Sequence, residues 1–240
     1  MSNPSYQPKT LAIGTNTDPY QPIEGQHKIM RGCLEVLRDF MHPVGIVTKG
    51  TLVERDIDIL REMAHDGLAR VGISITSLDP DLSRRFEPRV PSPARRFKTI
   101  ERLSEAGIPV TIFVAPVVPG LTDSDLEGIL QQAKDAGANS ATWSLLRLPF
   151  EVSGLFQDWL AQHYPSKVEK VMGKVRENHG GKDYDPQWGK RMRGEGVYAR
   201  FISQRFKVAC KRLDLDPTRV DLRADLFRVP PRVGDQLTLF

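Results

Sequence analysis

Five short runs rich in valine, isoleucine and threonine alternate with longer segments of helical pattern, and this alternation restricts the folds open to the chain. The predicted strands are LAIG (11–14), VGIVT (44–48), VGISIT (71–76), VTIFVAP (110–116) and ATWSLLRL (141–148). Several are apolar on both faces, which is typical of parallel strands covered by helices. The predicted intervening helices lie near 26–40, 54–66, 93–106 and 123–136. Right-handed crossovers make all five strands parallel, in an α/β partial barrel or open sheet.

Glycines mark the ends of three of these helices. Gly67, Gly107 and Gly137 each follow a helical segment, where a left-handed residue commonly terminates the helix. Thr122 and Asp123 are predicted to accept hydrogen bonds from the first-turn amides of the helix near 123–136. Further helices are predicted in 152–179 and 197–213. The expected organisation is a core over 1–150, a basic helical extension over 151–215 and a flexible tail over 216–240.

The composition excludes several classes of protein. The 240 residues contain no apolar run long enough to span a membrane, and the first ten residues lack the apolar core of a secretory signal. We therefore expect a cytoplasmic protein without a membrane partner. Cys33 and Cys210 are far apart and lie in helical patterns, so a cysteine-rich metal site is excluded.

Positive charge is concentrated in the last third of the chain. Residues 182–212 contain nine Lys and Arg against three Asp and Glu, with Tyr184, Trp188, Tyr198 and Phe201 among them. Cations interleaved with aromatic rings suit phosphate contact and base stacking. A solvated helix face explains the charge equally well, and helix packing explains Phe201, so both interpretations stay open.

Polar residues follow the predicted strands at their carboxyl ends, where parallel α/β folds bind ligands. They are Thr15, Asn16, Thr17 and Asp18 after the first strand, Lys49 after the second, Ser74 and Thr76 on the third, 116–123 after the fourth and Arg147 late in the fifth. Each has a structural explanation of its own, such as a turn at Asp18 before Pro19. Their recurrence at five strand ends favours a shared site.

Common catalytic motifs are absent from the sequence. It contains no G-x-G-x-x-G after a strand, no G-x-x-x-x-G-K-[ST] and no G-x-S-x-G, which argues against a dinucleotide enzyme, a P-loop NTPase and a serine hydrolase. The five histidines lack metal-ligand spacing. No catalytic residue is assigned.

Five segments, in order, resemble the radical S-adenosylmethionine (SAM) superfamily, specifically its DNA-repair-photolyase-like branch related to spore photoproduct lyase. They are GTNTDPYQPIE, IVTKG, ISITSLDPDLSRRFEPRVPSPARRF, VAPVVPGLTD and RMRGEG, and the resemblance covers roughly residues 5–213. It implies an incomplete parallel (β/α) barrel, a 4Fe-4S cluster held by three cysteines, and SAM on the cluster as the source of a 5′-deoxyadenosyl radical.

The resemblance also implies roles for individual residues. Lys49 is the expected charge partner of the SAM carboxylate, because its ammonium is a compact charge on a long stem. Ser74 resembles a serine that bonds the methionyl or ribose part. The other expected cofactor-binding residues are Thr15, Thr17, Asp18, Thr76, Pro116 and Gly120, the last two within a turn (115–120) that resembles the one whose backbone cradles adenosine.

The three-cysteine loop of the family is missing. In relatives it precedes the segment that corresponds to GTNTDPYQPIE, whereas in this chain only thirteen residues precede that segment. We therefore expect a fragment that lacks its first βα unit and is inactive in radical chemistry as it stands. Degeneration to a cluster-free protein is the less favoured explanation.

The last five residues, QLTLF, resemble the peptide by which bacterial repair proteins and polymerases dock on the DNA sliding clamp. Gln236, Leu237, Leu239 and Phe240 are the expected partner-binding residues, since three apolar side chains at a chain end have little other purpose. The alternative is that the peptide folds back on the barrel.

Together these features predict part of a radical SAM enzyme that acts on nucleic acid, with a DNA lesion as the favoured substrate. The alternative is a cluster-free module that binds a nucleotide or nucleic acid and docks on the clamp. A metal-independent barrel lyase would have only Asp18 and Lys49 as an acid/base pair.

Overall fold

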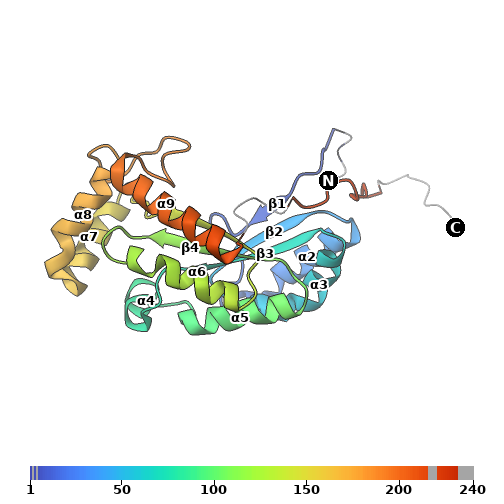
Figure 1. Cartoon of the computed structure of the whole chain (residues 1–240). Coiled ribbons are helices and arrows are strands. Elements are labelled where there is room, and N and C mark those ends of the chain that lie inside the picture. Colours follow the sequence, from blue (N-terminus) through green and yellow to red (C-terminus); the bar gives the residue numbers. More distant parts are fainter. Residues whose placement is uncertain (2, 4, 216–220, 232–240) are drawn as a thin grey trace, which may run out of the picture.

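A curved parallel sheet organises the chain, of which the computed structural model describes residues 1, 3, 5–215 and 221–231 (Figure 1). The strands are β1 (Leu11–Ile13), β2 (Val44–Thr48), β3 (Ala69–Ile75), β4 (Val110–Val117) and β5 (Ser140–Leu145). Their spatial order is β1-β2-β3-β4-β5, and every neighbouring pair is parallel. Within the described residues the sheet does not close from β5 to β1, so the fold is the predicted α/β partial barrel.

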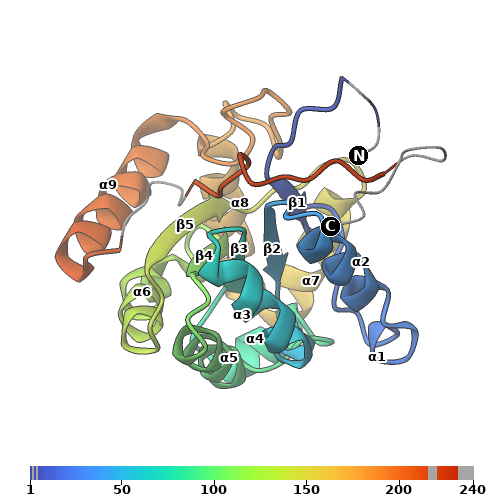
Figure 2. The same cartoon turned by 90° about the vertical axis from the view of Figure 1, so that its right-hand side faces the viewer.

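The two faces of the sheet differ in chemistry because side chains alternate along a strand. Val71, Ile73 and Ile75 of β3 are buried in the main hydrophobic core. Figure 2 shows α2, α3, α5 and α6 arranged around this convex face. Gly72 and Ser74 alternate with these residues and so belong to the opposite, concave face. The concave face is therefore the one that lacks the crossover helices.

Helices connect each strand to the next, as the sequence predicted, and the structure has more of them than were predicted. Those before β5 are α1 (Glu24–His27), α2 (Ile29–Asp39), the 3-10 helix η1 (Leu52–Asp56), α3 (Ile57–His65), α4 (Pro80–Phe86), α5 (Pro93–Glu105), the 3-10 helix η2 (Asp123–Asp125) and α6 (Leu126–Asp135). Those after β5 are α7 (Val152–His163), the 3-10 helix η3 (Pro165–Lys167), α8 (Val168–Glu177) and α9 (Gly196–Leu213). A second core, which includes Leu148, Phe156 and Val171, joins α7 and α8 to the end of the sheet.

Predicted helix ends agree with the structure at the three glycines and disagree at Thr122. Gly67, Gly107 and Gly137 have φ of +72°, +78° and +95°, the left-handed conformation expected after a helix. The Thr122 hydroxyl does not cap a helix, and accepts a 2.9 Å hydrogen bond from the Val118 amide, so it closes the preceding turn instead. Asp123 accepts a hydrogen bond from the Tyr198 hydroxyl rather than from a first-turn amide. The capping prediction was therefore wrong.

The segment after α9 returns to the amino ends of the strands. The Arg223 amide donates to Gly67 O (3.0 Å), just before β3, and the Arg228 amide donates to Phe40 O (2.9 Å), just before β2. The Phe227 ring lies 5.4 Å from the His42 ring, centroid to centroid. This contact holds residues 221–231 at the end of the sheet away from α7 and α8 (Figure 1).

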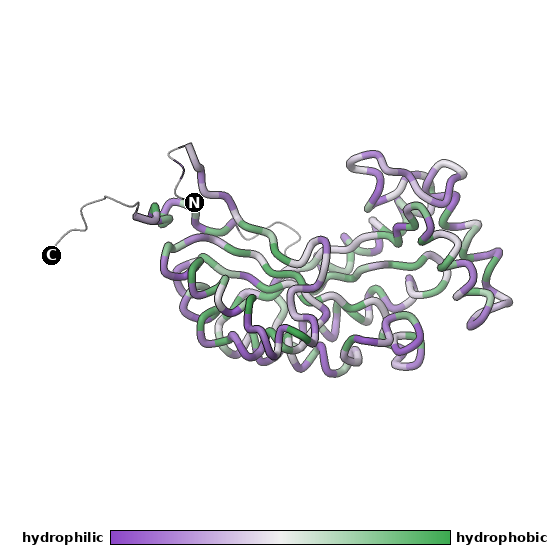
Figure 3. Tube along the Cα trace, turned by 180° about the vertical axis from the view of Figure 1, so that it is seen from behind, coloured by the Kyte–Doolittle hydropathy of each residue, from purple (hydrophilic) through white to green (hydrophobic). Residues whose placement is uncertain are grey.

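Hydropathy follows this architecture. Figure 3 shows hydrophobic residues gathered along the strands, and a largely hydrophilic segment between α8 and α9 that rises above the concave face. Within the described ranges, no helix combines the length and apolar character that a membrane crossing requires. Gln236, Leu237, Leu239 and Phe240 lie outside the described residues.

Candidate cofactor site

Strand pairing brings Lys49 and Ser74 together at the carboxyl ends of β2 and β3. The last recorded pair of these strands is Thr48 with Ile73, so the next residues, Lys49 and Ser74, are neighbours on the same face. That face is the concave one, to which Gly72 also belongs. The two residues predicted to hold the methionyl part of SAM thus occupy adjacent positions without packed hydrocarbon between their strands.

The Lys49 ammonium is held by a carboxylate that the sequence analysis did not select. Lys49 Nζ lies 2.6 Å from Glu87 Oε1, in the loop after α4. Arg96 Nη2 of α5 lies 2.8 Å from the other oxygen, Glu87 Oε2. The Thr76 hydroxyl lies 3.2 Å from Glu87 Oε1 and 3.0 Å from Ala115 O, and its one proton can be donated to either. Glu87 therefore links the ends of β2, β3 and β4 with α5.

Burial makes this cluster electrostatically strong. The side chains of Glu87 and Arg96 are 6% and 1% exposed, whereas that of Lys49 is 33% exposed. Burial alone would raise the pKa of Glu87, but Lys49 and Arg96 outweigh it and hold this pKa below its usual range. Two cations share one carboxylate, so the cluster keeps one excess positive charge. It can therefore attract a further anionic group.

Arg96 also fastens α5 to β3. Its Nη1 donates to Ser74 O (2.7 Å), and its Nε donates to Pro91 O (2.8 Å). The first of these bonds occupies the Ser74 carbonyl. The Ser74 hydroxyl forms no hydrogen bond with any of the described residues. The hydroxyl is thus available to a ligand on the concave face.

Asp18 joins the loop after β1 to the end of β2. Asp18 Oδ1 accepts from the Tyr20 amide (2.9 Å) and from the Thr48 hydroxyl (2.7 Å), while Oδ2 accepts from the Lys49 amide (2.8 Å). These three bonds make Asp18 a support for the backbone of Lys49. Thr15 and Thr17 of the same loop are exposed.

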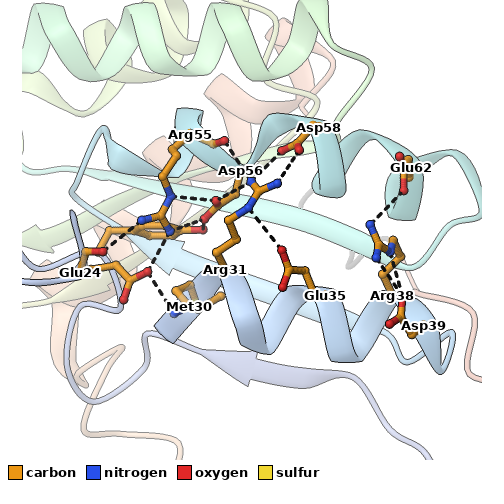
Figure 4. Close-up of polar contacts among 11 residues, drawn as sticks. Glu24, Met30, Arg31, Glu35, Arg38, Asp39, Arg55, Asp56, Asp58 and Glu62 are labelled. Atoms are coloured by element: carbon orange, nitrogen blue, oxygen red, sulfur yellow. Dashed lines mark hydrogen bonds and ion pairs between the residues drawn. The ribbon is translucent and has the colours of Figure 1, made fainter. Parts of the chain in front are cut away.

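An ion-pair network around Asp56 holds the loop after β1 at Tyr20, on the other side of the loop from Lys49 (Figure 4). Asp56 is fully buried, and its carboxylate lies 3.2 Å from Arg31 Nη1 and 2.9 Å from Arg55 Nη2. The Tyr20 hydroxyl donates to Asp56 Oδ2 (3.1 Å). Burial and the Asp56 carboxylate raise the pKa of Tyr20 well above its usual value, so the hydroxyl keeps its proton. Arg55 also pairs with Glu24 (2.8 Å), which ties α1 to η1.

The predicted adenosine turn lies at the end of β4. The pairing of β4 with β5 shifts register between Val114 and Val117, and the Ala115–Pro116 peptide bond is cis. Gly120 has φ +76°, and an added Cβ would lie 3.1 Å from Lys174 Cδ of α8. The hydroxyl of Thr76 connects this turn to β3 through Ala115 O. Pro116 thus lies near the end of β4, the strand beside β3, and Gly120 lies in the turn after it, where its positive φ favours glycine.

The cysteines present do not fit a three-thiolate cluster. Cys33 is exposed on α2, and Cys210 is buried in α9, where burial raises its thiol pKa to about 11. Among the described residues, no group of three His, Cys, Asp or Glu side chains is arranged to hold a metal ion. Two cysteines on separate helices do not fit the three-cysteine cluster that the resemblance implies. The excess positive charge beside Lys49 and the Ser74 hydroxyl lie at the carboxyl ends of β2 and β3, together called the rim, and both are complementary to a carboxylate such as that of SAM.

Sequence reasoning missed Glu87 and Arg96, although both lie in the quoted segment FEPRVPSPARRF. The available signal was local: Ser92 followed by Pro93 marks a helix start, and the Ser92 hydroxyl accepts from the Arg95 amide. Nothing in the sequence spacing indicates that Glu87 pairs with Lys49, so this ion pair could be identified only in the structure.

Comparison with known sequences identifies relatives that are longer than this chain and that it matches only in part. The family model described as Radical SAM superfamily matches residues 6–133. An uncharacterized protein of Mycobacterium tuberculosis is 38% identical over 172 residues, which are 71% of this chain and 51% of the relative. One of Methanocaldococcus jannaschii is 31% identical over 165 residues, 69% of this chain and 60% of the relative. The chain thus spans about half the length of the mycobacterial relative.

Comparison with solved structures finds the same fold in spore photoproduct lyase. A mutant of that enzyme superposes with a TM-score of 0.57 at 16% identity, covering 86% of this chain and 59% of the lyase. A double mutant with bound AdoMet and dinucleoside spore photoproduct gives a TM-score of 0.56 at 15% identity, covering 85% of this chain and 59% of the lyase. At this identity the similarity establishes the architecture.

Proposed function

The chain belongs to the radical SAM superfamily, and on that premise we propose that its rim at the carboxyl ends of β2 and β3 binds the methionyl part of SAM. The carrying observation is the adjacency of Lys49 and Ser74 beside a cluster with one excess positive charge. A carboxylate is the complementary ligand for such a cluster. When bound at a reduced cluster, SAM supplies the family's organic radical.

Each residue of the rim has a distinct task in this proposal. Lys49 directs its ammonium to the SAM carboxylate, and Ser74 offers its hydroxyl to the methionyl or ribose part. Glu87 orients Lys49 through their 2.6 Å ion pair. Asp18 fixes the Lys49 backbone through its amide. Thr15, Thr17, Thr76, Pro116 and Gly120 complete the proposed surroundings of the ribose and adenine.

Calorimetric titration of the 240-residue chain with SAM tests the binding site without iron. Lys49→Ala is expected to weaken binding about 10- to 100-fold, the loss of a charge-assisted hydrogen bond of about 1.5–3 kcal/mol. Lys98→Ala, at an exposed position on α5, removes the same charge and is expected to leave the affinity unchanged. Equal affinities of wild type and Lys49→Ala would remove Lys49 from the proposal.

For the intact protein, we propose a radical SAM enzyme that acts on nucleic acid, with a DNA lesion as the favoured substrate. Support comes from the basic segment 182–212 and from a fold shared with a lyase whose structure holds a dinucleoside photoproduct. The cluster thiolates would have to come from outside these 240 residues, because the chain has two cysteines.

Reconstitution tests the enzymatic proposal. A protein extended by a cysteine-bearing segment is loaded anaerobically with iron and sulfide, reduced in the presence of SAM, and assayed for 5′-deoxyadenosine. Formation of this product is expected in the extended protein and not in the 240-residue chain. Absence of product from the loaded, reduced, SAM-binding protein would contradict the proposal of radical chemistry.

The second candidate is a cluster-free module that binds nucleotide or nucleic acid and docks on the sliding clamp. It is favoured by the poor fit of Cys33 and Cys210 to a cluster. DNA binding that persists unchanged in Lys49→Ala, together with no SAM affinity in wild type, would support this module over the enzyme.

A further inference from the structure

A hollow of about 430 Å³ lies between β5 and α9, at the edge of the sheet opposite β1. Its floor includes the rings of Trp143 and Phe206, whose centroids are 6.2 Å apart. Figure 2 shows α9 standing beside β5 at the end of the row of strands. The hollow is separate from Lys49, which follows β2, and β2 lies three strands away from β5.

Three cations line this hollow: Arg193, Arg200 and Lys207. None of them has an ion-pair partner among the described residues. The acid in the lining, Glu195, is occupied, because its Oε2 lies 2.8 Å from Lys190 Nζ. By contrast, Arg205 on another side of α9 is paired with Glu127, with Arg205 Nε 2.7 Å from Glu127 Oε1. The hollow therefore presents positive charge that the fold itself does not neutralise.

The position of Arg193 is fixed without a carboxylate. Its Cζ lies 4.7 Å from the centroid of the Trp143 ring, and its Nη2 donates to the Thr142 hydroxyl (3.3 Å). A guanidinium held over an aromatic face keeps its remaining donors for an external acceptor. Phosphate oxygens are suitable acceptors, because they accept from guanidinium and hydroxyl groups alike.

Helical spacing extends this arrangement along α9. Arg200, Ser203 and Lys207 lie three and four residues apart, so they share one face of the helix and all line the hollow. Arg200 and Lys207 are separated along the axis by about 10 Å, from a rise of about 1.5 Å per residue. That length corresponds to about three nucleotides on one strand of a duplex.

We infer that the hollow between β5 and α9 is a groove for the phosphate backbone of a nucleic acid, contacted by Arg193, Arg200 and Lys207. This inference rests on the proposed nucleic-acid substrate and deepens it, because it locates the backbone contact. The groove is expected to bind the charged phosphates without selecting a base sequence, since its donors are guanidinium, ammonium and hydroxyl groups that contact phosphate oxygens. It would hold the strand along the β5 edge of the sheet, three strands away from the rim at the end of β2.

Fluorescence anisotropy with labelled single-stranded and duplex DNA tests the groove. The variant Arg193→Gln/Arg200→Gln/Lys207→Gln and wild type are titrated between 50 and 200 mM salt. Each lost phosphate contact lowers the slope of log K against log salt by about 0.7–0.9, so the triple variant is expected to lose about 2–3 in slope. Its SAM affinity is expected to equal that of wild type.

A matched control removes the same charge elsewhere. Arg61→Gln/Arg84→Gln/Lys98→Gln changes three exposed cations on α3, α4 and α5. The groove is supported when the control keeps the wild-type slope. It is refuted when both triple variants lose slope equally, or when poly-glutamate competes with DNA at equal charge concentration.

The outcomes also separate the groove from the proposed function. If wild type binds DNA and the triple variant keeps the same slope of log K against log salt, the groove is rejected. The proposal of a nucleic-acid substrate is then unaffected. Absence of DNA binding by wild type rejects both the groove and the nucleic-acid substrate, while the SAM titration still decides the cofactor site independently.

Discussion

The Lys49 ammonium and the Glu87 carboxylate form a 2.6 Å ion pair between the end of β2 and the loop after α4. The lysine is partly exposed and the glutamate is buried, so Glu87 acts as the fixed member and Lys49 as the member that can meet a ligand. A cofactor carboxylate entering this rim would share the Lys49 ammonium with Glu87. Cofactor affinity is consequently linked to the integrity of a buried protein ion pair.

Glu87→Gln is expected to destabilise the chain at pH 7 by about 3–5 kcal/mol, because it leaves the buried Arg96 without its countercharge. Lys49 and Arg96 lower the pKa of Glu87 in the folded state, so its ionisation stabilises the fold above the unfolded-state pKa of about 4.3. That stabilisation is lost as pH falls through the lower folded-state pKa. Urea unfolding at pH 7 and pH 3 should therefore show a smaller difference between wild type and Glu87→Gln at the lower pH.

The exposed carboxylate of Asp225 provides the control for this measurement. Asp225 pairs with Arg223 at 2.7 Å on the surface, where solvent screens the pair, and Asp225→Asn is expected to leave the free energy of unfolding almost unchanged. A pH-independent difference between wild type and Glu87→Gln would contradict the assigned role of the ion pair.

Two arginines of α5 should differ sharply in their contribution to stability. Arg96→Met removes a 1% exposed side chain bonded to Glu87, Ser74 and Pro91, and we expect a loss of about 3–5 kcal/mol. Arg102→Met removes an exposed partner of Glu54, and we expect a loss below about 1 kcal/mol. Thermal and urea unfolding of both variants measure the contrast. Similar losses for the two would show that burial of Arg96 is not the determining factor.

Glycine is required at the end of β1 for a reason that tests the packing of the loop. Gly14 has φ +92°, and an added Cβ would lie 1.9 Å from Val47 O of β2. Gly14→Ala combines positive-φ strain of about 1–3 kcal/mol with overpacking of about 1–3 kcal/mol, so we expect a loss above about 3 kcal/mol. Gly107 has φ +78° and no atom within 4 Å of an added Cβ. Gly107→Ala should therefore cost about 1 kcal/mol in the same unfolding assay.

The peptide QLTLF predicts a partner that can be measured directly. Replacement of Leu237 and Phe240 by alanine is expected to abolish binding of the chain to a purified bacterial sliding clamp, because these side chains would fill its apolar pocket. Surface plasmon resonance measures the interaction, and Gln236→Ala serves as a milder change in the same peptide. Undiminished binding by the double variant would exclude this mode of docking.

The sequence predicted the sheet well because the signals for strands and helix ends are local. The β2 range matches residue for residue, and β4 extends one residue past its predicted end. Helix α4 was missed because it has seven residues, begins at Pro80 and shows little apolar periodicity. The helical stretch predicted over 152–179 is divided at Tyr164, before Pro165, since a proline cannot continue the hydrogen bonds of a helix.

The candidate site was only partly accessible to the same reasoning. Lys49 and Ser74 could be chosen because strand ends are recognisable and the segments resemble a family. Glu87 could not, because its contact with Lys49 depends on how residues 77–92 fold across the strand ends. Asp18 was assigned to the ribose side, and its carboxylate already accepts three hydrogen bonds within the protein. Its contact with the cofactor stays a prediction.

The contacts of Arg223, Phe227 and Arg228 hold the terminal segment at the amino ends of β2 and β3. The described chain consequently ends at the pole of the molecule opposite the Lys49 rim (Figure 1). A protein attached through the residues after 231 would be tethered at the back of the barrel. The carboxyl ends of the strands would stay uncovered, so a partner bound at the opposite end would not obstruct a ligand that enters the rim.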